Sequence, residues 1–265
     1  MVFGKGSPSK FSGFLSGIKD GSAFQLQLKD RVSAGKVLAM VLKTVIKKRN
    51  SLLVLGIPRG GVIVADVVAE KLNADYFDIV IPRKLRAPDN KENAIGAIAG
   101  PDGSTMYLDE FMINSLKVPI DYIEKEKEEQ LEEIKRRTEL YRRRSPSDSV
   151  SPQTQPTATE EIDYPITAGK TNVLLIDDGI ATGATVIAAA GWLRTKYRPA
   201  QLIIAAPVAS KQAIELIRKE NVADIVETVT TPANFVSVSQ FYKDFDQATD
   251  GRVVEIVDRW RNKKR

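Results

Sequence analysis

The chain has 265 residues and a mass of 29.2 kDa, which suits one domain with a sizeable core. It contains no cysteine and no histidine, which excludes a disulfide framework, a Cys/His zinc site, a cysteine nucleophile and a Ser-His-Asp triad. The net charge of +5 arises in residues 259–265, which hold five basic residues and no acid and are predicted to be a basic tail. The rest of the chain is neutral, so a nucleic-acid partner is not expected.

Apolar periodicity predicts strands that alternate with helices along most of the chain. The run at 52–55 is continuously apolar, as in a strand buried on both faces, whereas Leu38, Val41, Leu42 and Val45 have helical spacing. The predicted strands are 52–55, 76–81, 173–176, 202–206 and 224–229, and the predicted helices are 30–48, 62–72, 121–144, 184–196, 211–220 and 252–261. This order predicts an α/β fold with an open parallel sheet and flanking helices.

Three segments depart from this alternation. Residues 1–29 are predicted to be a flexible N-terminal extension, and 145–168, rich in Ser, Thr, Pro and Gln, a disordered insertion. Residues 94–99 and 104–108, joined by Gly-Pro-Asp-Gly, predict a hairpin flap. A single domain is therefore expected over residues 30–258.

The segment 173–185, VLLIDDGIATGAT, carries the strongest functional signal. Asp177 and Asp178 follow four apolar residues, at the carboxyl end of a predicted strand, where open α/β sheets bind ligands. Ala181 to Thr185 then offer small side chains, two hydroxyls and a helix N-terminus, which suit a phosphate group. Adjacent carboxylates accept hydrogen bonds from vicinal hydroxyls, so a ribose 5-phosphate fits both halves of the motif.

This motif resembles the binding motif for 5-phosphoribosyl 1-diphosphate (PRPP) in type I phosphoribosyltransferases. The resemblance covers roughly residues 30–258 and is strongest to the predicted phosphoribosyltransferases of unassigned substrate. It includes the blocks IPRGGV at 57–62 and FYKDF at 241–245. The resemblance implies the parallel-sheet fold of that family, with a flexible hairpin flap and a C-terminal hood segment.

The resemblance also implies roles for matching residues. Asp177 and Asp178 would hold the ribose 2- and 3-hydroxyls, directly or through water bound to Mg²⁺, the implied cofactor. The 5-phosphate would lie on Ala181, Thr182, Gly183, Ala184 and Thr185. Arg59, Gly60 and Gly61 match the loop that binds diphosphate, which in this family often holds a non-proline cis peptide bond; alone, they would indicate only a strand-to-helix turn.

Further roles are implied for residues outside these loops. Arg83 and Lys84 resemble a catalytic Arg-Lys pair that contacts diphosphate. The alternative is that they are two solvated cations in a loop. Residues 84–109 would form the flexible catalytic loop. Phe235 would stack on the base or belong to the core. Three further aromatics are predicted to pack against the C-terminal helix: Phe241, Tyr242 and Phe245.

The expected function is Mg²⁺-dependent transfer of 5-phosphoribosyl from PRPP to a nucleobase or related nitrogen nucleophile, with release of diphosphate. Ala181 stands where 6-oxopurine members have an acid, which argues against hypoxanthine or guanine. A non-catalytic PRPP sensor and a nucleoside or nucleotide phosphorylase or hydrolase are the alternatives. The resemblance implies a homodimer. The lack of cysteine and of an apolar run of about 18 residues favours a cytoplasmic protein without a membrane span.

Overall fold

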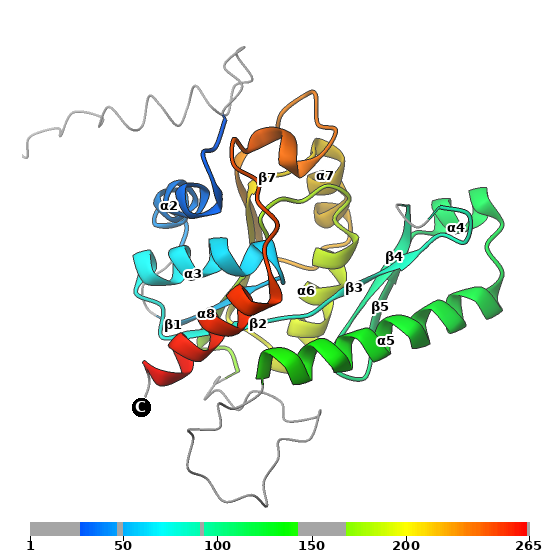
Figure 1. Ribbon diagram of the computed structural model, residues 1–265, viewed down its shortest axis with the longest axis horizontal. Helices are drawn as coiled ribbons and strands as arrows, with labels where there is room; N and C mark the ends of the chain where they lie inside the picture. Colours follow the sequence, from blue (N-terminus) through cyan, green and yellow to red (C-terminus); the bar gives the residue numbers. More distant parts are fainter. Residues whose placement is uncertain (1–26, 47–49, 91–92, 143–167, 264–265) are drawn as a thin grey trace, which may run out of the picture.

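A computed structural model describes residues 27–46, 50–90, 93–142 and 168–263. It contains a five-stranded parallel sheet in the order β2-β1-β6-β7-β8 and a three-stranded antiparallel sheet in the order β3-β4-β5 (Figure 1). The predicted α/β fold is therefore confirmed. Nearly all of the predicted extension and insertion lies outside the described residues.

The strands of the parallel sheet lie close to their predicted positions: β1 Ser51–Gly56, β2 Tyr76–Ile79, β6 Thr171–Ile176, β7 Gln201–Val208 and β8 Ile225–Thr230. β6 lies at the centre, between β1 and β7, and all six of its residues are buried. The four apolar residues of β6, Val173 to Ile176, are stable there because helices cover both faces of the sheet. The central position of β6 also places the residues that follow it in the middle of the carboxyl edge.

Alternate residues of the sheet face two helical layers. On one face, Leu174 and Ile176 pack in the same core as α2 Arg31–Leu42, α3 Gly60–Leu72 and α8 Asp250–Asn262. On the other, Val173 and Leu175 pack with α6 Ala184–Tyr197 and α7 Lys211–Lys219. These layers are visible on either side of the sheet in Figure 1. The sheet is thus rigidly held, and its carboxyl edge carries the loops considered below.

The predicted hairpin is part of a larger arm that extends to one side of the molecule (Figure 1). Its strands are β3 Arg83–Arg86, β4 Ala94–Ala99 and β5 Thr105–Leu108, and its helices are α4 Glu110–Leu116 and α5 Ile120–Arg142. Of these elements, β3 and α4 were not predicted from the sequence. Leu85, Ile95 and Ile98 pack in the core that includes α5, whereas Ala97 and Ala99 pack with α6. The hairpin prediction is confirmed, and its two faces are covered by helices.

The chain ends differ from their predicted boundaries. Helix α8 continues to Asn262, so Arg259 and Arg261 belong to it rather than to a tail, and Trp260 is buried against Phe77 with ring centroids 5.1 Å apart. Lys263 pairs with Glu70 at 2.9 Å. The sequence predicted both a helix to Arg261 and a basic tail from Arg259. Ion pairs to Asp66 and Glu70 on α3, which are distant in sequence, instead hold Arg259 and Lys263 to the domain.

The predicted N-terminal boundary at residue 30 is also too late. Leu28 is buried and forms a parallel bridge with Tyr242. Phe241 and Tyr242 pack with Leu28, Ala34 and Val208, which corrects the prediction that they pack against the C-terminal helix. A short 3-10 helix, η1 Val238–Phe241, leads into this contact. The start of the domain is therefore paired with the segment that precedes α8.

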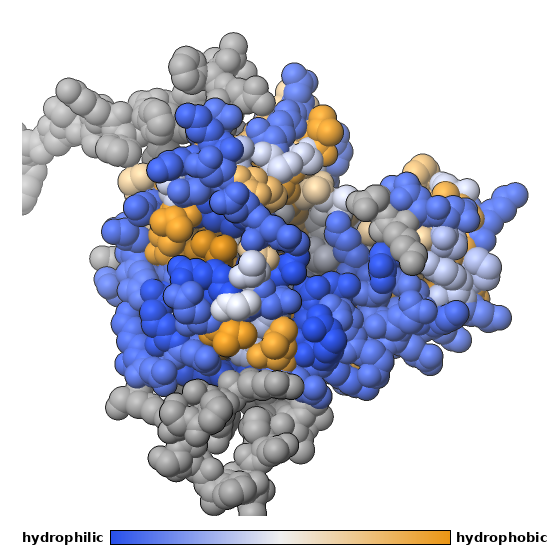
Figure 2. All heavy atoms as spheres, in the orientation of Figure 1, coloured by the Kyte–Doolittle hydropathy of each residue, from blue (hydrophilic) through white to orange (hydrophobic). Residues whose placement is uncertain are grey.

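The surface is mostly hydrophilic on the face shown in Figure 2, with small separate hydrophobic patches. Within the described residues, none of the helices has the length and apolar character that crossing a bilayer requires.

Candidate active site

Asp177 and Asp178 lie at the carboxyl end of β6, as predicted, and both are half-buried. The backbone N–H of Asp178 donates a hydrogen bond to Asp177 Oδ1 at 2.8 Å. Desolvation and the neighbouring Asp178 carboxylate raise the pKa of Asp177 well above its usual value, and the charge of Lys84 partly opposes this shift. Two acids at one strand end therefore form an electrostatically costly pair suited to accepting hydrogen bonds.

The loop between β1 and α3 packs directly against this acid pair. The Pro58–Arg59 peptide bond is cis, as the resemblance implied. A Cβ atom on Gly60 would lie 1.8 Å from Asp178 Oδ2, and one on Gly61 would lie 2.8 Å from Asp177 Cα. Both positions therefore require glycine, because any side chain would collide with the acids. The loop and the acid pair, predicted separately, form one site.

The loop at 181–185 lies beside the acids and opens α6. Ala181 and Thr182 are exposed, and Gly183 occupies the N-cap position with φ +87°, where no side chain caps the helix. The first N–H groups of α6 thus have no side-chain acceptor, and the helix N-terminus favours an anion. Ser210 supports the loop from the end of β7 by donating a hydrogen bond to the Ala181 carbonyl at 2.6 Å.

A second structure, not foreseen from the sequence, holds the acid pair from the opposite side. We call residues 28–31 and 241–246 the hood clamp. Its two segments are joined by backbone N–H to carbonyl hydrogen bonds of 2.8 Å. They run from Leu28 to Phe241, from Lys243 to Leu28 and from Asp244 to Lys29. These bonds join the 241–245 block to the N-terminal side of the domain.

Two side chains of the hood clamp reach Asp178. Arg31 Nε lies 2.7 Å from Asp178 Oδ2, and the Tyr242 hydroxyl donates a hydrogen bond to the Asp178 carbonyl at 2.7 Å. Burial raises the pKa of Tyr242, and the charge of Asp178 adds to this effect. The hydroxyl consequently remains a donor across the ordinary pH range, and the backbone and side chain of Asp178 are both anchored.

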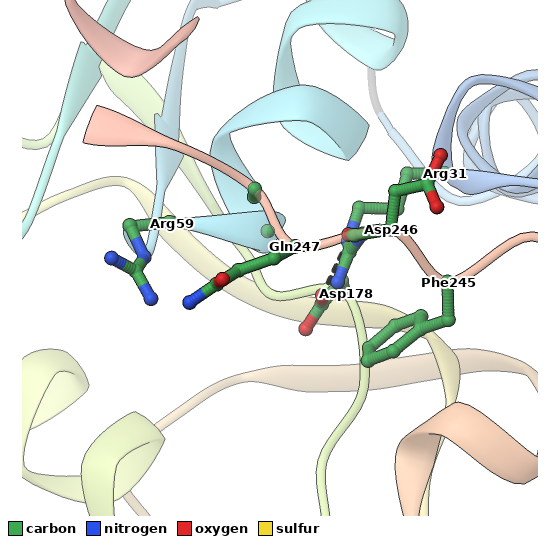
Figure 3. A pocket seen from close by; sticks show the side chains of 8 residues that line it. Arg31, Arg59, Asp178, Phe245, Asp246 and Gln247 are labelled. Atoms are coloured by element: carbon green, nitrogen blue, oxygen red, sulfur yellow. Dashed lines mark hydrogen bonds and ion pairs between the residues drawn. The ribbon is translucent and has the colours of Figure 1, made fainter. Parts of the chain in front are cut away.

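A pocket of about 470 Å³ lies between the acid pair, the cis-peptide loop and the hood clamp (Figure 3). Arg31 and Arg59 contribute cations to it from different elements, and Asp178 lies between them. The Arg59 guanidinium is one-third exposed, with its nearest acid, Asp250, at 3.9 Å. The pocket is lined by Arg31, Arg59, Gly60, Asp178, Phe245, Asp246, Gln247 and Ala248. Such a mixture of cations, backbone and acids suits a phosphorylated ligand.

The predicted Arg-Lys pair is divided between two environments. Lys84 is exposed, and its positive charge acts on Asp177. Arg83 instead donates a hydrogen bond from Nε to Gln130 Oε1 on α5 at 2.9 Å, and burial lowers its pKa. The structure therefore brings Lys84 to the acid pair and directs Arg83 to the arm. The sequence predicted Arg83 and Lys84 at the end of the second strand, whereas they begin a separate strand, β3, in which adjacent residues point to opposite faces.

The hood aromatics are also rearranged relative to expectation. Phe235 is partly buried and packs on Phe241 with ring centroids 5.4 Å apart, and it is not among the residues that line the pocket. Phe245 lines the pocket instead, with its ring over the Arg31 guanidinium. The block at 241–245 was a signal for this region. Nothing in the sequence linked it to Arg31.

Within the described part of the chain, no three Asp, Glu, His or Cys side chains converge on a possible metal position. The acid pair provides two carboxylates. Magnesium commonly uses one or two carboxylates, retains several waters and takes further ligands from substrate phosphates. The residues present therefore fit a magnesium ion that arrives with a phosphorylated substrate, rather than one held by protein alone.

Comparisons with known proteins agree with this geometry. A family model described as the phosphoribosyl transferase domain matches residues 87–245. Two Mycobacterium tuberculosis proteins, from strains CDC 1551 / Oshkosh and ATCC 25618 / H37Rv, are provisionally named as phosphoribosyl transferases. Each is 35% identical over 230 residues, which is 87% of this chain and 46% of the relative. The chain thus spans about half the length of these curated relatives.

A solved structure shows the same architecture over almost its whole length. The crystal structure of TT1426 from Thermus thermophilus is 33% identical, with a TM-score of 0.63, and the match covers 88% of this chain and 99% of that one. The family model includes the acid pair and the 181–185 loop, whereas Arg31 and the cis-peptide loop precede its matched range. Since the model matches more than half of the chain, this protein belongs to the phosphoribosyl transferase family.

Proposed function

We propose that the protein transfers the 5-phosphoribosyl group of PRPP to a nucleobase or related nitrogen nucleophile and releases diphosphate. The observation that carries the proposal is the position of the acid pair between two helix N-termini. Neither α3 nor α6 has a side-chain cap, and each begins beside Asp177 and Asp178. A ligand with a phosphate on each side of a ribose matches this arrangement.

Each part of PRPP has a matching surface. Asp177 and Asp178 accept hydrogen bonds from the vicinal hydroxyls of the ribose. The 5-phosphate lies on the N-terminus of α6, against the backbone of residues 181–185. The diphosphate enters the 470 Å³ pocket beside Arg59, Gly60 and Gly61. Gly60 leaves the backbone accessible at this point, since a side chain there would meet the acids.

The proposed reaction breaks the bond between ribose C1 and the diphosphate oxygen and forms a bond from C1 to the acceptor nitrogen. Positive charge develops on the ribose ring, and negative charge develops on the departing diphosphate. The guanidinium of Arg59 and the ammonium of Lys84 stabilise the latter charge. The acceptor proton passes to solvent or to the released diphosphate, so no histidine is required.

We also propose Mg²⁺ as the cofactor, held by Asp177 and Asp178 through water. When bound, it would neutralise charge on the diphosphate. The protein contributes orientation: the acids fix the ribose, and the N-terminus of α6 fixes its phosphate. A homodimer, as the family resemblance implies, is part of the proposal and is checked by light scattering of the full chain.

The test is calorimetric titration of PRPP with Mg²⁺ into wild type and into the double variant Asp177→Asn, Asp178→Asn. We expect a loss of affinity of more than about 100-fold, because hydrogen bonds to charged groups are each worth roughly 1.5–3 kcal/mol. The matched control is Asp121→Asn, Asp258→Asn, which removes two helical acids away from the pocket and should bind as wild type does. Unchanged affinity in the acid-pair variant would refute the site.

A panel of nucleobases then separates catalysis from its alternatives. Release of diphosphate from PRPP in the presence of one base supports the transferase. Tight PRPP binding without turnover for any base would favour a sensor, and consumption of inorganic phosphate with a nucleoside would favour a phosphorylase. The exposed residues Ala181 and Thr182, the exposed Lys84 and the partly exposed Arg59 favour the first outcome.

A further inference from the structure

The Arg31 guanidinium is held by three contacts. Its Nε contacts Asp178 Oδ2 at 2.7 Å, and its Nη1 group donates a hydrogen bond to the Asp246 carbonyl at 2.6 Å. The Phe245 ring centroid lies 3.9 Å from the guanidinium carbon. The side chains of Arg31 and Asp178 are only 10% and 16% exposed. The planar guanidinium is therefore held between two acceptors, with Nε directed at the Asp178 carboxylate and Nη1 at the Asp246 carbonyl.

Asp178 requires such a partner. Its neighbour Asp177 is stabilised through Oδ1 by the Asp178 N–H, but the two negative charges at the end of β6 repel each other. The contact at Oδ2 restricts the orientation of the Asp178 carboxylate and leaves Oδ1 as the oxygen that Arg31 does not contact. The ion pair also lies against the cis-peptide loop, where a Cβ on Gly60 would come within 2.6 Å of Arg31 Nε.

We infer that Arg31 is a positioning residue: it orients Asp178 so that the acid pair discriminates ribose from sugars that lack a vicinal hydroxyl. This inference rests on the proposed function. It also assigns a purpose to the hood clamp, because the hood supplies both the Asp246 carbonyl and the Phe245 ring that hold Arg31. Residue 31 lies outside the range that the family model matches.

Arg59 provides a useful contrast within the same pocket. Its side chain is 33% exposed, and the nearest carboxylate oxygen, on Asp250, is 3.9 Å away. Arg59 can therefore turn toward a ligand phosphate. Arg31 already donates to Asp178 and Asp246, and moving it would leave Asp178 without its counter-charge. The two arginines thus have different tasks: Arg59 meets the ligand, and Arg31 acts through Asp178.

The experiment measures a ratio of affinities rather than a single affinity. Ribose 5-phosphate and 2-deoxyribose 5-phosphate are titrated calorimetrically, with Mg²⁺, into the full-length wild type, Arg31→Gln and Arg31→Lys. We expect Arg31→Gln to reduce the preference for ribose 5-phosphate by about tenfold and to change the affinity for the deoxy sugar little. Arg31→Lys should fall between them, because an ammonium cannot serve Asp178 and Asp246 with the same fork geometry.

The matched control is Arg194→Gln at the other end of α6. Arg194 likewise binds one carboxylate, Asp224 at 2.9 Å, and one backbone carbonyl, that of Val222 at 3.1 Å. Its loss should leave the ribose preference unchanged. Melting temperatures of all variants are recorded, and Arg31→Lys carries the test if Arg31→Gln does not fold.

Two outcomes would overturn the positioning role of Arg31 and leave the proposed function standing. One is a wild-type ribose preference in Arg31→Gln, and the other is an equal loss of affinity for both sugars, which would mean a general charge or folding effect. Failure of wild type to bind either sugar phosphate or PRPP would instead overturn the proposed function. A reduced preference with a retained fold supports the positioning role.

Discussion

The 181–185 loop and the hood clamp hold the two ends of the same candidate site but are built in different ways. The loop follows β6 directly and continues into α6, so its shape depends on residues that are neighbours in the chain. The hood clamp joins residues as far apart as Arg31 and Asp246, which are 215 positions apart. One is a local turn at the edge of a buried sheet, and the other exists only after two segments more than 200 residues apart have paired.

This difference separates two tasks of the site. Backbone N–H groups at a helix N-terminus bind a phosphate whatever the sugar, so under the proposed function the loop would provide affinity. The hood clamp would orient the Asp178 carboxylate and so govern which hydroxyls are accepted. Changes in the loop should therefore weaken all sugar phosphates alike, whereas changes in the hood clamp should alter the preference between them.

The largest effect is expected at Gly60, in the cis-peptide loop, which packs against both Asp178 and Arg31 of the hood clamp. In Gly60→Ala the new Cβ would lie 1.8 Å from Asp178 Oδ2 and 2.6 Å from Arg31 Nε, so the ion pair must move. We expect PRPP affinity to fall by about 100-fold, as for removal of a positioned charged contact. Calorimetry with PRPP and Mg²⁺ measures the effect.

Gly251→Ala is the control for Gly60→Ala, because the nearest atom to its Cβ would be Thr249 Oγ1 at 3.9 Å. This substitution lies in the first turn of α8 and should leave affinity unchanged. Wild-type affinity in Gly60→Ala would show that the ion pair between Arg31 and Asp178 can move without weakening PRPP binding. The cis-peptide loop and the hood clamp would then act independently.

Ser210→Ala tests the 181–185 loop alone. We expect a smaller loss of affinity that is equal for the different sugar phosphates. The Ser210 hydroxyl supports the Ala181 carbonyl and accepts a hydrogen bond from the Ala213 N–H at the start of α7. Its loss removes a helix cap and leaves a carbonyl unpaired, at a cost of roughly 2 kcal/mol in unfolding free energy. Affinities for ribose and 2-deoxyribose 5-phosphates should fall together, by about fivefold. A selective loss for one sugar would contradict the division of tasks.

Asp177→Asn tests the electrostatic cost of the acid pair through the pH dependence of the free energy of unfolding. The pKa of Asp177 is raised in the folded protein, so the folded state binds a proton on the Asp177 carboxyl more tightly than the unfolded state does. The ionised group therefore costs stability, and the cost grows as pH rises above the unfolded value of 3.8 toward the folded pKa. At pH 7.5 we expect Asp177→Asn to be more stable than wild type by on the order of 1 kcal/mol. Urea unfolding measures this, and Asn retains the acceptor oxygen.

The same comparison at pH near 3.8 provides the check. There the wild-type acid is largely protonated in the folded state and half protonated in the unfolded state, and the advantage of Asp177→Asn should shrink toward zero. A variant less stable than wild type at pH 7.5 would contradict the assigned direction of the shift.

Much of the fold and the local half of the site could be predicted because the signals were contiguous. The strand, the acids and the loop at 173–185 stand in one segment, and a buried parallel strand has a clear apolar pattern. The cis-peptide loop was recognised for the same reason. Bounds of most helices and strands differ from the prediction by one or two residues, since terminal residues carry weak signals.

The hood clamp could not be predicted because its residues have ordinary local roles. Arg31 reads as a polar residue in the first turn of a helix, and Phe245 reads as a core aromatic. The contact depends on Leu28 pairing with residues near 242, and no periodicity encodes a pairing over more than 200 positions. Arg83 was misplaced for a related reason: its partner Gln130 lies on α5, 47 residues away.

The smallest expected effect is also the most discriminating for the hood clamp. Tyr242→Phe removes only the hydroxyl that donates to the Asp178 carbonyl at 2.7 Å, while the ring stays packed with Leu28 and Phe241. Since the raised pKa of Tyr242 keeps this hydroxyl protonated at any working pH, its loss should matter equally at pH 6 and pH 9. We expect a decrease of about 1 kcal/mol in unfolding free energy.

The ribose preference of Tyr242→Phe decides what the hood clamp does for Asp178. A preference reduced by about twofold, less than in Arg31→Gln, is expected because the hydroxyl holds the backbone of Asp178 whereas Arg31 holds its carboxylate. Calorimetry with both sugar phosphates measures it. An unchanged ribose preference with a lowered free energy of unfolding would mean that Tyr242 only joins the two segments of the hood clamp. Orientation of the acid pair would then depend on the side-chain ion pair alone, which Arg31→Gln tests separately.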